Sequence, residues 1–382
     1  MRVAIFHATF DVAGGGERLV LQIARALDEL GHEVDLYTTY LDQRVFRLLA
    51  SDLGWQRPPK VVRAPLAGLL RVVARGRAVR LWRLLAFREV GKYLRRAMED
   101  YDVVVETRSN VPLDVDVSYI HYPAVLDYLA DKHTSIHWRV YNWLVMELAE
   151  RARGSPRLVL TNSSWTAEKV REAYGLEARV LYPPVEVERF EGVDLNRKEN
   201  IVLTVSRFSQ EKNLDTIVRI ARLVPEAQFY VVGSTSPYSR PVINRLTGLI
   251  DELGAKNVHI ETDVPRGRLD ELYSQAKIYL HPPFPEHFGI AIAEGAAAGA
   301  VPVVYRDGGG WTDIASRIDP MLGYTNIEEA ASAIRGLLGD DARRARLAAR
   351  AREVARGFSY ASFRASVRAA VEEVAKLKGL RV

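Results

Sequence analysis

Residues 281–294 read His-Pro-Pro-Phe-Pro-Glu-His-Phe-Gly-Ile-Ala-Ile-Ala-Glu, and a stretch rich in Gly and Ala follows up to residue 310. Gly289 opens an Ala-rich segment that predicts a helix, whose first N–H groups favour a phosphate. Glu294 would lie about two turns along this helix, where a carboxylate can accept hydrogen bonds from the vicinal hydroxyls of a ribose. Glu286, just before the helix, can face polar groups beyond the phosphate. The layout suits a nucleotide-sugar, but it also fits a buried strand, a proline turn and a helix with two solvated glutamates.

Apolar strand patterns and amphipathic helix patterns alternate on both sides of this stretch. The predicted strands are 3–7, 33–38, 103–106, 117–121, 158–161, 200–206, 228–232, 258–261, 278–281 and 301–305. The predicted helices are 17–30, 163–174, 214–223 and 360–378, together with the one that begins after Gly289. Such alternation is typical of α/β proteins with parallel, doubly wound sheets.

Tyr182-Pro183-Pro184 interrupts the alternation, which then restarts, so this tripeptide is typical of an interdomain linker. We therefore expect two Rossmann-like domains, residues 1–183 and 184–358. The C-terminal helix, about 359–382, is expected to pack back on the first domain. Ligands of such sheets bind beyond the carboxyl ends of the strands. We expect the two domains to face each other across a cleft.

The composition excludes several classes of protein. The 382 residues include no cysteine, which excludes disulfides, thiolate nucleophiles and Cys-based zinc sites. Apolar residues make up 48% of the chain, but no uninterrupted apolar run approaches the ~20 residues of a transmembrane helix. The N-terminus reads as a short strand rather than a signal peptide. These features lead us to expect an intracellular protein.

The net charge of +5 is unevenly distributed, because residues 57–96 hold twelve Lys and Arg residues and one acid. Basic and apolar side chains fall near opposite faces of a helix from Arg77 onward, a pattern that favours an anionic membrane surface. The alternative is an ordinary surface helix that packs its apolar side on the first sheet. The residues expected to contact the membrane are Arg75, Arg77, Arg80, Trp82 and Arg83.

Three further sets of residues are placed where chemistry could occur. A glycine loop, Gly14-Gly15-Gly16, lies between the first predicted strand and helix, where backbone can approach a phosphate closely. Arg207 and Lys212 follow the first strand of the second domain, where cations could neutralise a pyrophosphate. His121 ends an apolar strand of the first domain. Taken singly, each is equally a tight turn, a charged surface loop or a structural histidine.

Two possible metal motifs are set aside. Asp114-Val-Asp116 matches an Asp-x-Asp metal motif, but it precedes a strand instead of following one. His133 and His137 have helical spacing, but no nearby Glu or third ligand completes a metal site. We therefore predict no metal site.

In their order along the chain, these elements resemble the retaining family 4 glycosyltransferases, which have the GT-B fold. The resemblance runs from Gly14 to Asp313 and implies roles for individual residues. Gly15 and Gly16 would approach the donor phosphate, and His121 would contact the sugar near the reacting carbon. Arg207 and Lys212 would hold the pyrophosphate, and Glu286 would contact the sugar. The backbone around Phe288, Gly289 and Ile290 would meet sugar and phosphate. Glu294 would bind the ribose, and Asp263 and Val264 would contact the base.

Within the family, the chain is most similar to the GDP-mannose-dependent mannosyltransferases that assemble lipid-linked oligosaccharides. The similarity lies in the stretches Gly14–Arg18, His121–Pro123, Asn162–Thr166, Tyr182–Pro184 and Glu286–Ile290. It implies α-mannosyl transfer from GDP-mannose with retained configuration and without a metal cofactor. The acceptor would be a glycan or a lipid-linked glycan, and the enzyme would lie peripherally at the cytoplasmic face of a membrane.

Other functions stay open at this point. A UDP-sugar-dependent transferase with a soluble acceptor would carry the same motifs. A phosphorylase of the same fold usually needs a pyridoxal lysine and a longer chain, and a sugar-phosphate epimerase is a further alternative. An Arg-rich nucleic-acid-binding protein is disfavoured, because no nucleic-acid module is recognisable and the charge outside 57–96 is net acidic.

Overall fold

The structure is a computed structural model that describes residues 1–380 with gaps. The gaps are Val12, 56–57, 64–95, 97–98, Ser109, Ala124, 127–139, 141–142, 144–145, 148–149 and 151–155. The chain forms two compact units: Met1–Pro184 together with Ala361–Val382, and Val185–Tyr360. The division falls at Pro184 and Tyr360, beside the proline pair that the sequence marks as a linker.

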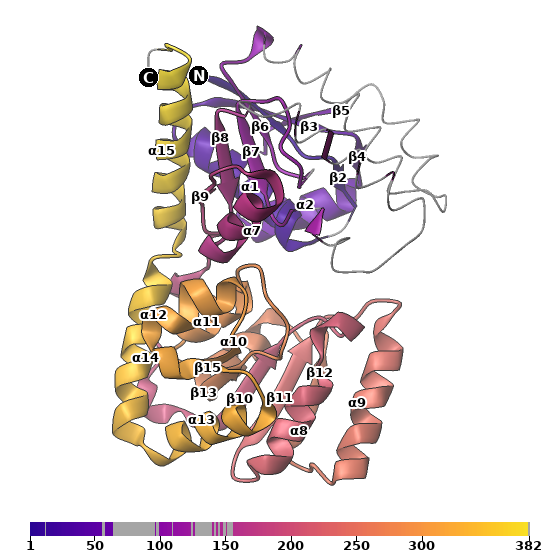
Figure 1. Ribbon diagram of the computed structural model, residues 1–382, viewed down its shortest axis with the longest axis vertical. Coiled ribbons are helices and arrows are strands. Elements are labelled where there is room, and N and C mark those ends of the chain that lie inside the picture. Colours follow the sequence, from indigo (N-terminus) through magenta and orange to yellow (C-terminus); the bar gives the residue numbers. More distant parts are fainter. Residues whose placement is uncertain are drawn as a thin grey trace. The chain divides into compact units, whose positions relative to one another are not determined.

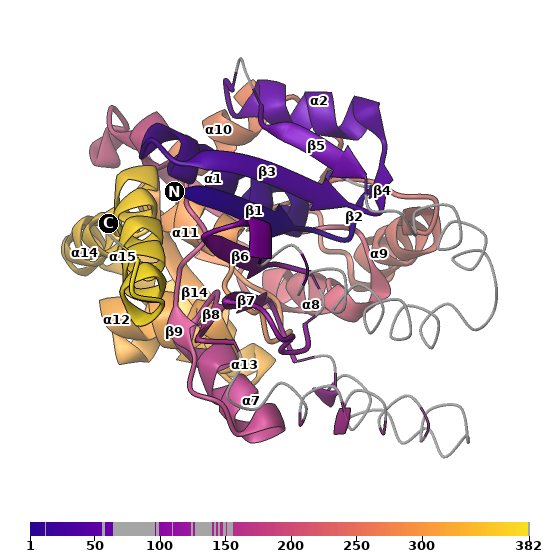
Figure 2. The ribbon, with the colours of Figure 1, turned by 90° about the horizontal axis from the view of Figure 1, so that it is seen from above.

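The first unit is built on one parallel sheet with the strand order β5-β3-β1-β6-β7-β8-β9 (Figure 2). Its strands are β1 (Arg2–Phe6), β3 (Glu33–Thr38), β5 (Lys60–Arg63), β6 (Val103–Glu106), β7 (Val117–Ile120), β8 (Leu158–Thr161) and β9 (Arg179–Val180). Two short strands, β2 (Thr9–Phe10) and β4 (Tyr40–Leu41), pair with each other. The residues of β6, β7 and β8 are all buried, which explains why they are mostly apolar.

The helices described in this unit are α1 (Gly15–Glu29), α2 (Gln43–Asp52), α7 (Ser164–Tyr174) and α15 (Tyr360–Leu377). Ser163 caps α7 by accepting a hydrogen bond from the backbone of Thr166, and Gly175 ends it in the left-handed region. The stretch Asn162-Ser163-Ser164, which also matches a glycosylation sequence, is therefore a helix start.

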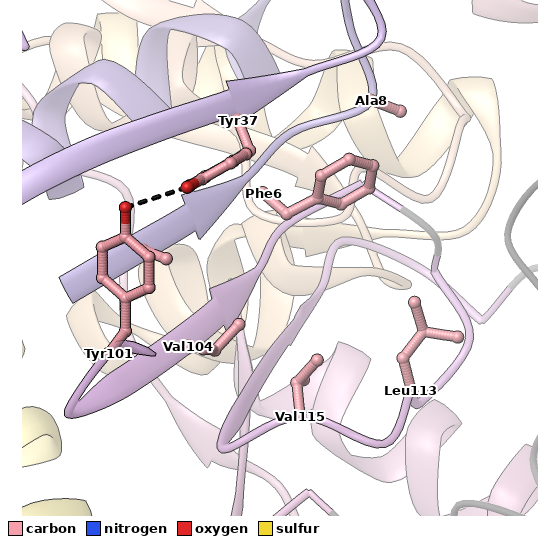
Figure 3. Close-up of a cluster of buried hydrophobic side chains, with 8 residues drawn as sticks. Phe6, Ala8, Tyr37, Tyr101, Val104, Leu113 and Val115 are labelled. Carbon is pink, nitrogen blue, oxygen red and sulfur yellow. Dashed lines mark hydrogen bonds between the residues drawn. The ribbon is translucent and has the colours of Figure 1, made fainter. Parts of the chain in front are cut away.

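An aromatic and aliphatic cluster fills one side of the first sheet (Figure 3). Phe6 of β1 and Val104 of β6 contribute apolar side chains from neighbouring strands. Tyr37 and Tyr101 join the cluster through their rings, and their hydroxyls share a hydrogen bond of 2.9 Å. The Tyr101 hydroxyl also donates a hydrogen bond to a carboxylate oxygen of Asp35, so the polar atoms at the edge of the cluster are satisfied. The cluster fixes β1 beside β6, and this pairing positions the candidate site of this unit.

The C-terminal helix α15 lies alongside the first unit (Figure 1). Arg364 contacts Glu29 of α1 at 3.2 Å, and Lys378 contacts Asp116 at 3.0 Å. Asp116 is fully buried and also accepts a hydrogen bond from the backbone of Val104. Asp116, the second carboxylate of the Asp-x-Asp motif, therefore links Lys378, just after α15, to strand β6 of the sheet.

The second unit repeats the architecture with the strand order β12-β11-β10-β13-β14-β15, again parallel. Its strands are β10 (Glu199–Val205), β11 (Gln228–Gly233), β12 (Val258–Thr262), β13 (Ala276–Leu280), β14 (Val301–Tyr305) and β15 (Gly323–Tyr324). Its helices are α8 (Asp215–Leu223), α9 (Ser239–Leu253), α10 (Arg266–Gln275), α11 (Ile290–Ala297), α12 (Ser316–Ile318), α13 (Ile327–Gly339) and α14 (Asp341–Arg356). The unit also contains the short 3₁₀ helices η1 (Val187–Phe190), η2 (Leu195–Arg197), η3 (Gln210–Lys212) and η5 (Pro320–Leu322), and the π-helix η4 (Gly310–Ala315). The helix α8 packs against α9 and α13, and α11 packs against α14.

The basic segment predicted to bind a membrane, with Arg75, Arg77, Arg80, Trp82 and Arg83, lies outside the described residues. The pair His133 and His137 also lies outside them. Within the described ranges, none of the helices combines the length and the apolar run needed to cross a bilayer.

Candidate functional site

The strand order of the second unit defines where its site should lie. Numbered along the chain, the order is 3-2-1-4-5-6, and the direction of winding reverses between β10 and β13. Ligands of open parallel sheets bind at this switch point, beyond the carboxyl ends of the two strands. The segment that follows β10 carries Arg207 and Lys212, and the segment that follows β13 carries Glu286. The topology therefore brings together two parts of the chain that are far apart in the sequence.

Lys212 and Glu286 form an ion pair at this switch point. The Lys212 ammonium lies 2.8 Å from one carboxylate oxygen of Glu286 and 4.0 Å from the centre of the Phe284 ring. The Lys212 side chain is 8% exposed, whereas that of Glu286 is 29% exposed. Lys212 is therefore the buried partner of the pair, and the Glu286 carboxylate is the more accessible one.

The charges around Glu286 favour its ionised form. Burial opposes ionisation, but Lys212 at 2.8 Å outweighs it and holds the pKa of Glu286 below its usual value. His281 is fully buried, and burial lowers the pKa of its ring to about 4. At neutral pH an ionised Glu286 therefore lies beside a neutral His281.

Two glycines shape the backbone around Glu286. Gly308 has φ +87°, and a β-carbon there would lie 2.5 Å from the carbonyl oxygen of Glu286. The backbone of Gly309 donates a hydrogen bond of 2.7 Å to that oxygen. Gly289 has φ +97° and forms the N-cap of α11. Close backbone packing beside Glu286 therefore requires glycine at 308, and the left-handed backbone at the start of α11 favours glycine at 289.

Phe288 and Ile290, which flank Gly289, face different surroundings. Phe288 is buried and packs edge-on against Phe358 at 5.0 Å between ring centres. Ile290, the first residue of α11, is exposed. Of these two side chains, only that of Ile290 is available to a ligand, while Phe288 can contribute its backbone.

Glu294 lies in the fifth position of α11, which is about one and a half turns from the N-cap and not the two turns expected from the sequence. One carboxylate oxygen accepts a hydrogen bond of 2.9 Å from Arg266, and the other accepts one of 2.9 Å from the hydroxyl of Tyr273. Both partners belong to α10. Sequence reasoning missed them, because only the fold brings α10 beside α11.

The other predicted residues of the second unit stand apart from the Lys212–Glu286 pair. The Arg207 side chain is 72% exposed, with Glu211 at 3.9 Å, so the structure does not pair it with Glu286. Asp263 is exposed with φ +50°, and its carboxylate accepts two hydrogen bonds from Thr235. These bonds lower the pKa of Asp263. Val264, the next residue, is half-buried. This turn lies at the carboxyl ends of β11 and β12.

In the first unit, the glycine loop and His121 lie close together. Gly14 is the N-cap of α1, and Gly15 and Gly16 are its first residues. A β-carbon on Gly16 would lie 3.7 Å from the ring of His121, whereas one on Gly15 would meet nothing within 4 Å. The His121 ring donates through Nε2 to the carbonyl of Thr107 at 3.1 Å. The structure therefore brings Gly16, but not Gly15, against His121.

Arg108, Glu17 and His7 complete this group, and sequence reasoning gave none of them a role. Arg108 lies 2.7 Å from Glu17 and 3.6 Å from the β-carbon position of Gly16. Nε2 of the buried His7 lies 3.8 Å from the same oxygen of Glu17. No sequence signal singles out Arg108, because it comes beside the glycine loop only through the pairing of β6 with β1.

Among the described residues, no group of three or more His, Asp or Glu side chains is placed to hold a metal ion. Asp116 is committed to Lys378 and to the backbone of Val104, as described above.

Two parallel, doubly wound units that share one strand order define the GT-B class of glycosyltransferases. Solved structures of that architecture match almost the whole chain. HepE from Anabaena, solved in complex with UDP, has a TM-score of 0.72 and 18% identity, and the match covers 98% of this chain and all of that one. WaaG, a glycosyltransferase involved in lipopolysaccharide biosynthesis, has a TM-score of 0.68 and 19% identity over 96% of this chain and 98% of that one. The predicted α/β fold with two Rossmann-like domains is therefore confirmed.

Sequence comparison then identifies the family. The model described as Glycosyltransferase Family 4 matches residues 13–189, and the one described as Glycosyl transferases group 1 matches 186–354. The chain belongs to glycosyltransferase family 4, which confirms the resemblance deduced from its motifs.

Two relatives with curated activities are mannosyltransferases. A GDP-Man:Man(3)GlcNAc(2)-PP-Dol alpha-1,2-mannosyltransferase from Dictyostelium discoideum is 24% identical, with the match covering 64% of this chain and 56% of that protein. An alpha-1,3/1,6-mannosyltransferase, ALG2, from Rhizomucor pusillus is 26% identical over 81% of this chain and 77% of that one. The chain thus spans about half the length of the alpha-1,2 relatives, with 56% for the Dictyostelium and 47% for the human protein.

Proposed function

We propose that this glycosyltransferase is an α-mannosyltransferase that transfers mannose from GDP-mannose to a lipid-linked glycan with retention of configuration. One observation carries the choice of sugar: the relatives described above are mannosyltransferases, and the alpha-1,2 enzymes are named for GDP-mannose. The alpha-1,2 relatives are also named for an acceptor in which a glycan is joined to dolichol through a diphosphate. Such an acceptor would place the enzyme at a membrane, and we propose the cytoplasmic face.

We propose for individual residues the roles that the family resemblance implies. In the second unit, Lys212 and Arg207 stabilise the departing diphosphate, Glu286 accepts hydrogen bonds from the sugar hydroxyls, and Glu294 binds the ribose. Gly289 and Ile290 offer backbone N–H groups at the start of α11 to the phosphate, and Asp263 and Val264 face the base. In the first unit, Gly15 and Gly16 leave room for the phosphate, and His121 contacts the sugar.

Retention would follow a front-face route. In this route the leaving phosphate takes the proton of the acceptor hydroxyl while that oxygen attacks the anomeric carbon from the same side. The positive charge of Lys212, held in place by Glu286 at 2.8 Å, stabilises the negative charge that accumulates on the phosphate. Protein cations and the helix start then act where other transferases use a metal ion. We therefore propose that activity survives chelation by EDTA, and a loss that Mn²⁺ restores would argue against it.

The donor is tested by measuring transfer from a panel of GDP- and UDP-sugars to Man(3)GlcNAc(2) carried on a lipid diphosphate. GDP-mannose should support release of GDP and extension of the glycan, and an α linkage in the product should appear by NMR. Release of nucleotide from UDP-sugars alone would reject GDP-mannose while leaving the glycosyltransferase assignment intact.

A UDP-sugar donor with a soluble acceptor is the second candidate, and one observation favours it. HepE, whose fold matches nearly the whole chain, was solved with UDP. Thermal shift separates the two donors, because the nucleotide that binds the folded state more tightly raises the melting temperature further at equal concentration.

The proposed membrane association rests on the charge of residues 57–96. Basic side chains near an anionic surface contribute about 1 kcal/mol each. The chain should therefore bind anionic liposomes at low salt and be released as salt screens the charges. Replacing Arg75, Arg77, Arg80 and Arg83 with Gln should abolish this binding and leave nucleotide affinity unchanged. Equal sedimentation of wild type and variant with liposomes would remove the segment from the proposal.

A further inference from the structure

Arg108 lies at the switch point of the first unit. Counted along its main sheet, the strands of this unit have the order 3-2-1-4-5-6-7, and the winding reverses between β1 and β6. The glycine loop follows β1, and Arg108 follows β6. The backbone of Arg108 donates a hydrogen bond of 2.6 Å to Glu106, and its guanidinium donates one of 2.7 Å to Glu17. Both ends of the residue are therefore held by carboxylates.

The Arg108–Glu17 pair presents its cation to the solvent. The Glu17 side chain is 2% exposed, whereas that of Arg108 is 33% exposed. Burial opposes ionisation of Glu17, but His7 and Arg108 together hold its pKa below the usual value. Glu17 is therefore a buried counter-ion, and the guanidinium is the group that a ligand can reach.

The side chain of His7 lies on the buried side of Glu17. It is fully buried, and burial holds the pKa of its ring below the usual value, so the ring is neutral at neutral pH. Its Nε2, 3.8 Å from Glu17, has no hydrogen-bond partner among the described residues. A neutral ring adds no second cation that would compete with Arg108 for the carboxylate.

Gly16 leaves a space that Arg108 and His121 border. Its β-carbon position is 3.6 Å from the Arg108 guanidinium and 3.7 Å from the ring of His121. These are ordinary contact distances, so the fold itself does not forbid an alanine at this position. The first backbone N–H groups of α1 also lack carbonyl partners within the helix. A guanidinium beside a helix start can accommodate a phosphate group, because its positive charge complements the negative charge of the phosphate.

We propose that Arg108 binds a phosphate group of a substrate, with Glu17 as the positioning residue that aims the guanidinium. The proposal rests on the proposed transferase function, because that function supplies two sources of phosphate: the diphosphate of the nucleotide-sugar and the diphosphate of a lipid-linked acceptor. A guanidinium suits both, since its planar fork can donate two parallel hydrogen bonds to phosphate oxygens.

Binding of inorganic pyrophosphate to the full chain, measured by calorimetry, tests the shared chemistry. The measurements use an Arg207→Ala, Lys212→Ala background, so that the cations of the second unit do not mask the result. Arg108→Gln should weaken pyrophosphate binding about tenfold or more, as expected for losing charge-assisted hydrogen bonds. The matched control is Arg25→Gln, because Arg25 is 31% exposed and pairs with Glu29 at 2.8 Å in the same unit. Equal affinities in the Arg108 and Arg25 variants would overturn the proposal.

Further variants guard against misfolding and test positioning. Arg108→Gln leaves the buried carboxylate of Glu17 without its cation, which can destabilise the fold. The double variant Glu17→Gln, Arg108→Gln removes both charges and should bind pyrophosphate as weakly as the single one. Glu17→Gln alone should weaken binding severalfold, and its effect should disappear when Arg108 is already Gln. A Glu17 that only stabilised the fold would lower the melting temperature without this coupling.

Two kinetic arms identify the source of the phosphate. If Arg108 contacts the donor, Arg108→Gln should slow hydrolysis of GDP-mannose in the absence of acceptor. If it contacts the acceptor, the variant should raise KM for a glycan on a lipid diphosphate but not for the same glycan without the diphosphate. Unchanged values in both arms would overturn the proposal. A wild type that transfers no sugar would reject the proposed function, whereas the pyrophosphate comparison would still decide the role of Arg108.

Discussion

The two units share a strand order, and each carries an ion pair and a buried histidine at its switch point. In the second unit the pair is Lys212–Glu286 at 2.8 Å, and in the first it is Arg108–Glu17 at 2.7 Å. The orientation of the charges is opposite. Lys212 is buried and Glu286 is the more exposed partner, whereas Glu17 is buried and Arg108 is the more exposed one.

Because of this difference, the two ion pairs offer different charged groups to a ligand. An accessible carboxylate backed by a buried ammonium suits hydroxyl groups, which can donate hydrogen bonds to it. An accessible guanidinium backed by a buried carboxylate suits phosphate oxygens. The same sheet architecture thus offers opposite charges to a ligand, depending on which member of the pair is buried.

The largest effect is expected for the cation of the second unit. Lys212→Ala should lower kcat by roughly 10²-fold or more, because it removes a charge that stabilises the departing phosphate. Arg207→Ala should lower kcat as well, but by less, because Arg207 is not held by a buried partner. Lys277→Ala is the matched control, since Lys277 is a half-buried lysine of the same unit that contacts Asn200 and Asp341 instead. Steady-state kinetics that gave the Lys212 and Lys277 variants equal rates would contradict this role.

The carboxylate of α11 should have the next largest effect, on binding. Glu294→Ala should weaken affinity for free GDP by ~1–3 kcal/mol, the range for lost hydrogen bonds to a charged group. Calorimetry checks this, with Glu271→Ala as the control, because Glu271 lies on α10 and pairs with Arg268. An affinity for GDP that did not change in the Glu294 variant would remove Glu294 from the ribose site.

Much of the fold could be predicted because each core strand is an apolar run bounded by polar or turn residues. The run Val103–Glu106 is buried throughout, for example, and its limits agree with the sequence pattern. The ion pairs could not be predicted, because their members are brought together by the strand order. Nothing in Glu106-Thr107-Arg108 distinguishes the arginine until β6 is known to pair with β1. In the Asp-x-Asp motif the sequence suggests a metal ligand, but the structure pairs its second carboxylate, Asp116, with Lys378.

The buried histidine of the second unit gives a pH dependence of stability. His281 has a pKa of about 4 when folded, below the ~6.5 of an unfolded histidine. The unfolded chain therefore binds more protons between these values, and the stability contributed by neutral His281 is complete above pH 6.5 and lost as the pH falls towards 4. Between pH 7 and pH 5 the wild type should lose about 1–2 kcal/mol of unfolding free energy relative to His281→Gln. Urea denaturation at the two pH values measures this, and parallel losses in the two proteins would show that another group titrates.

The smallest effect, and the sharpest test of the first unit, concerns Gly16. Alanine in place of a helical glycine stabilises a helix by roughly 0.5–1 kcal/mol, and the nearest atoms to the new β-carbon would be 3.6 Å away. Gly16→Ala should therefore raise the melting temperature. It should also lower kcat/KM severalfold, because the methyl group fills the space beside Arg108 and His121. Gly248→Ala, in the middle of α9 with nothing within 4 Å, should raise stability and leave activity unchanged. If both alanine variants were equally active, the space above Gly16 would not hold a ligand, and the first unit would have to bind its substrate elsewhere.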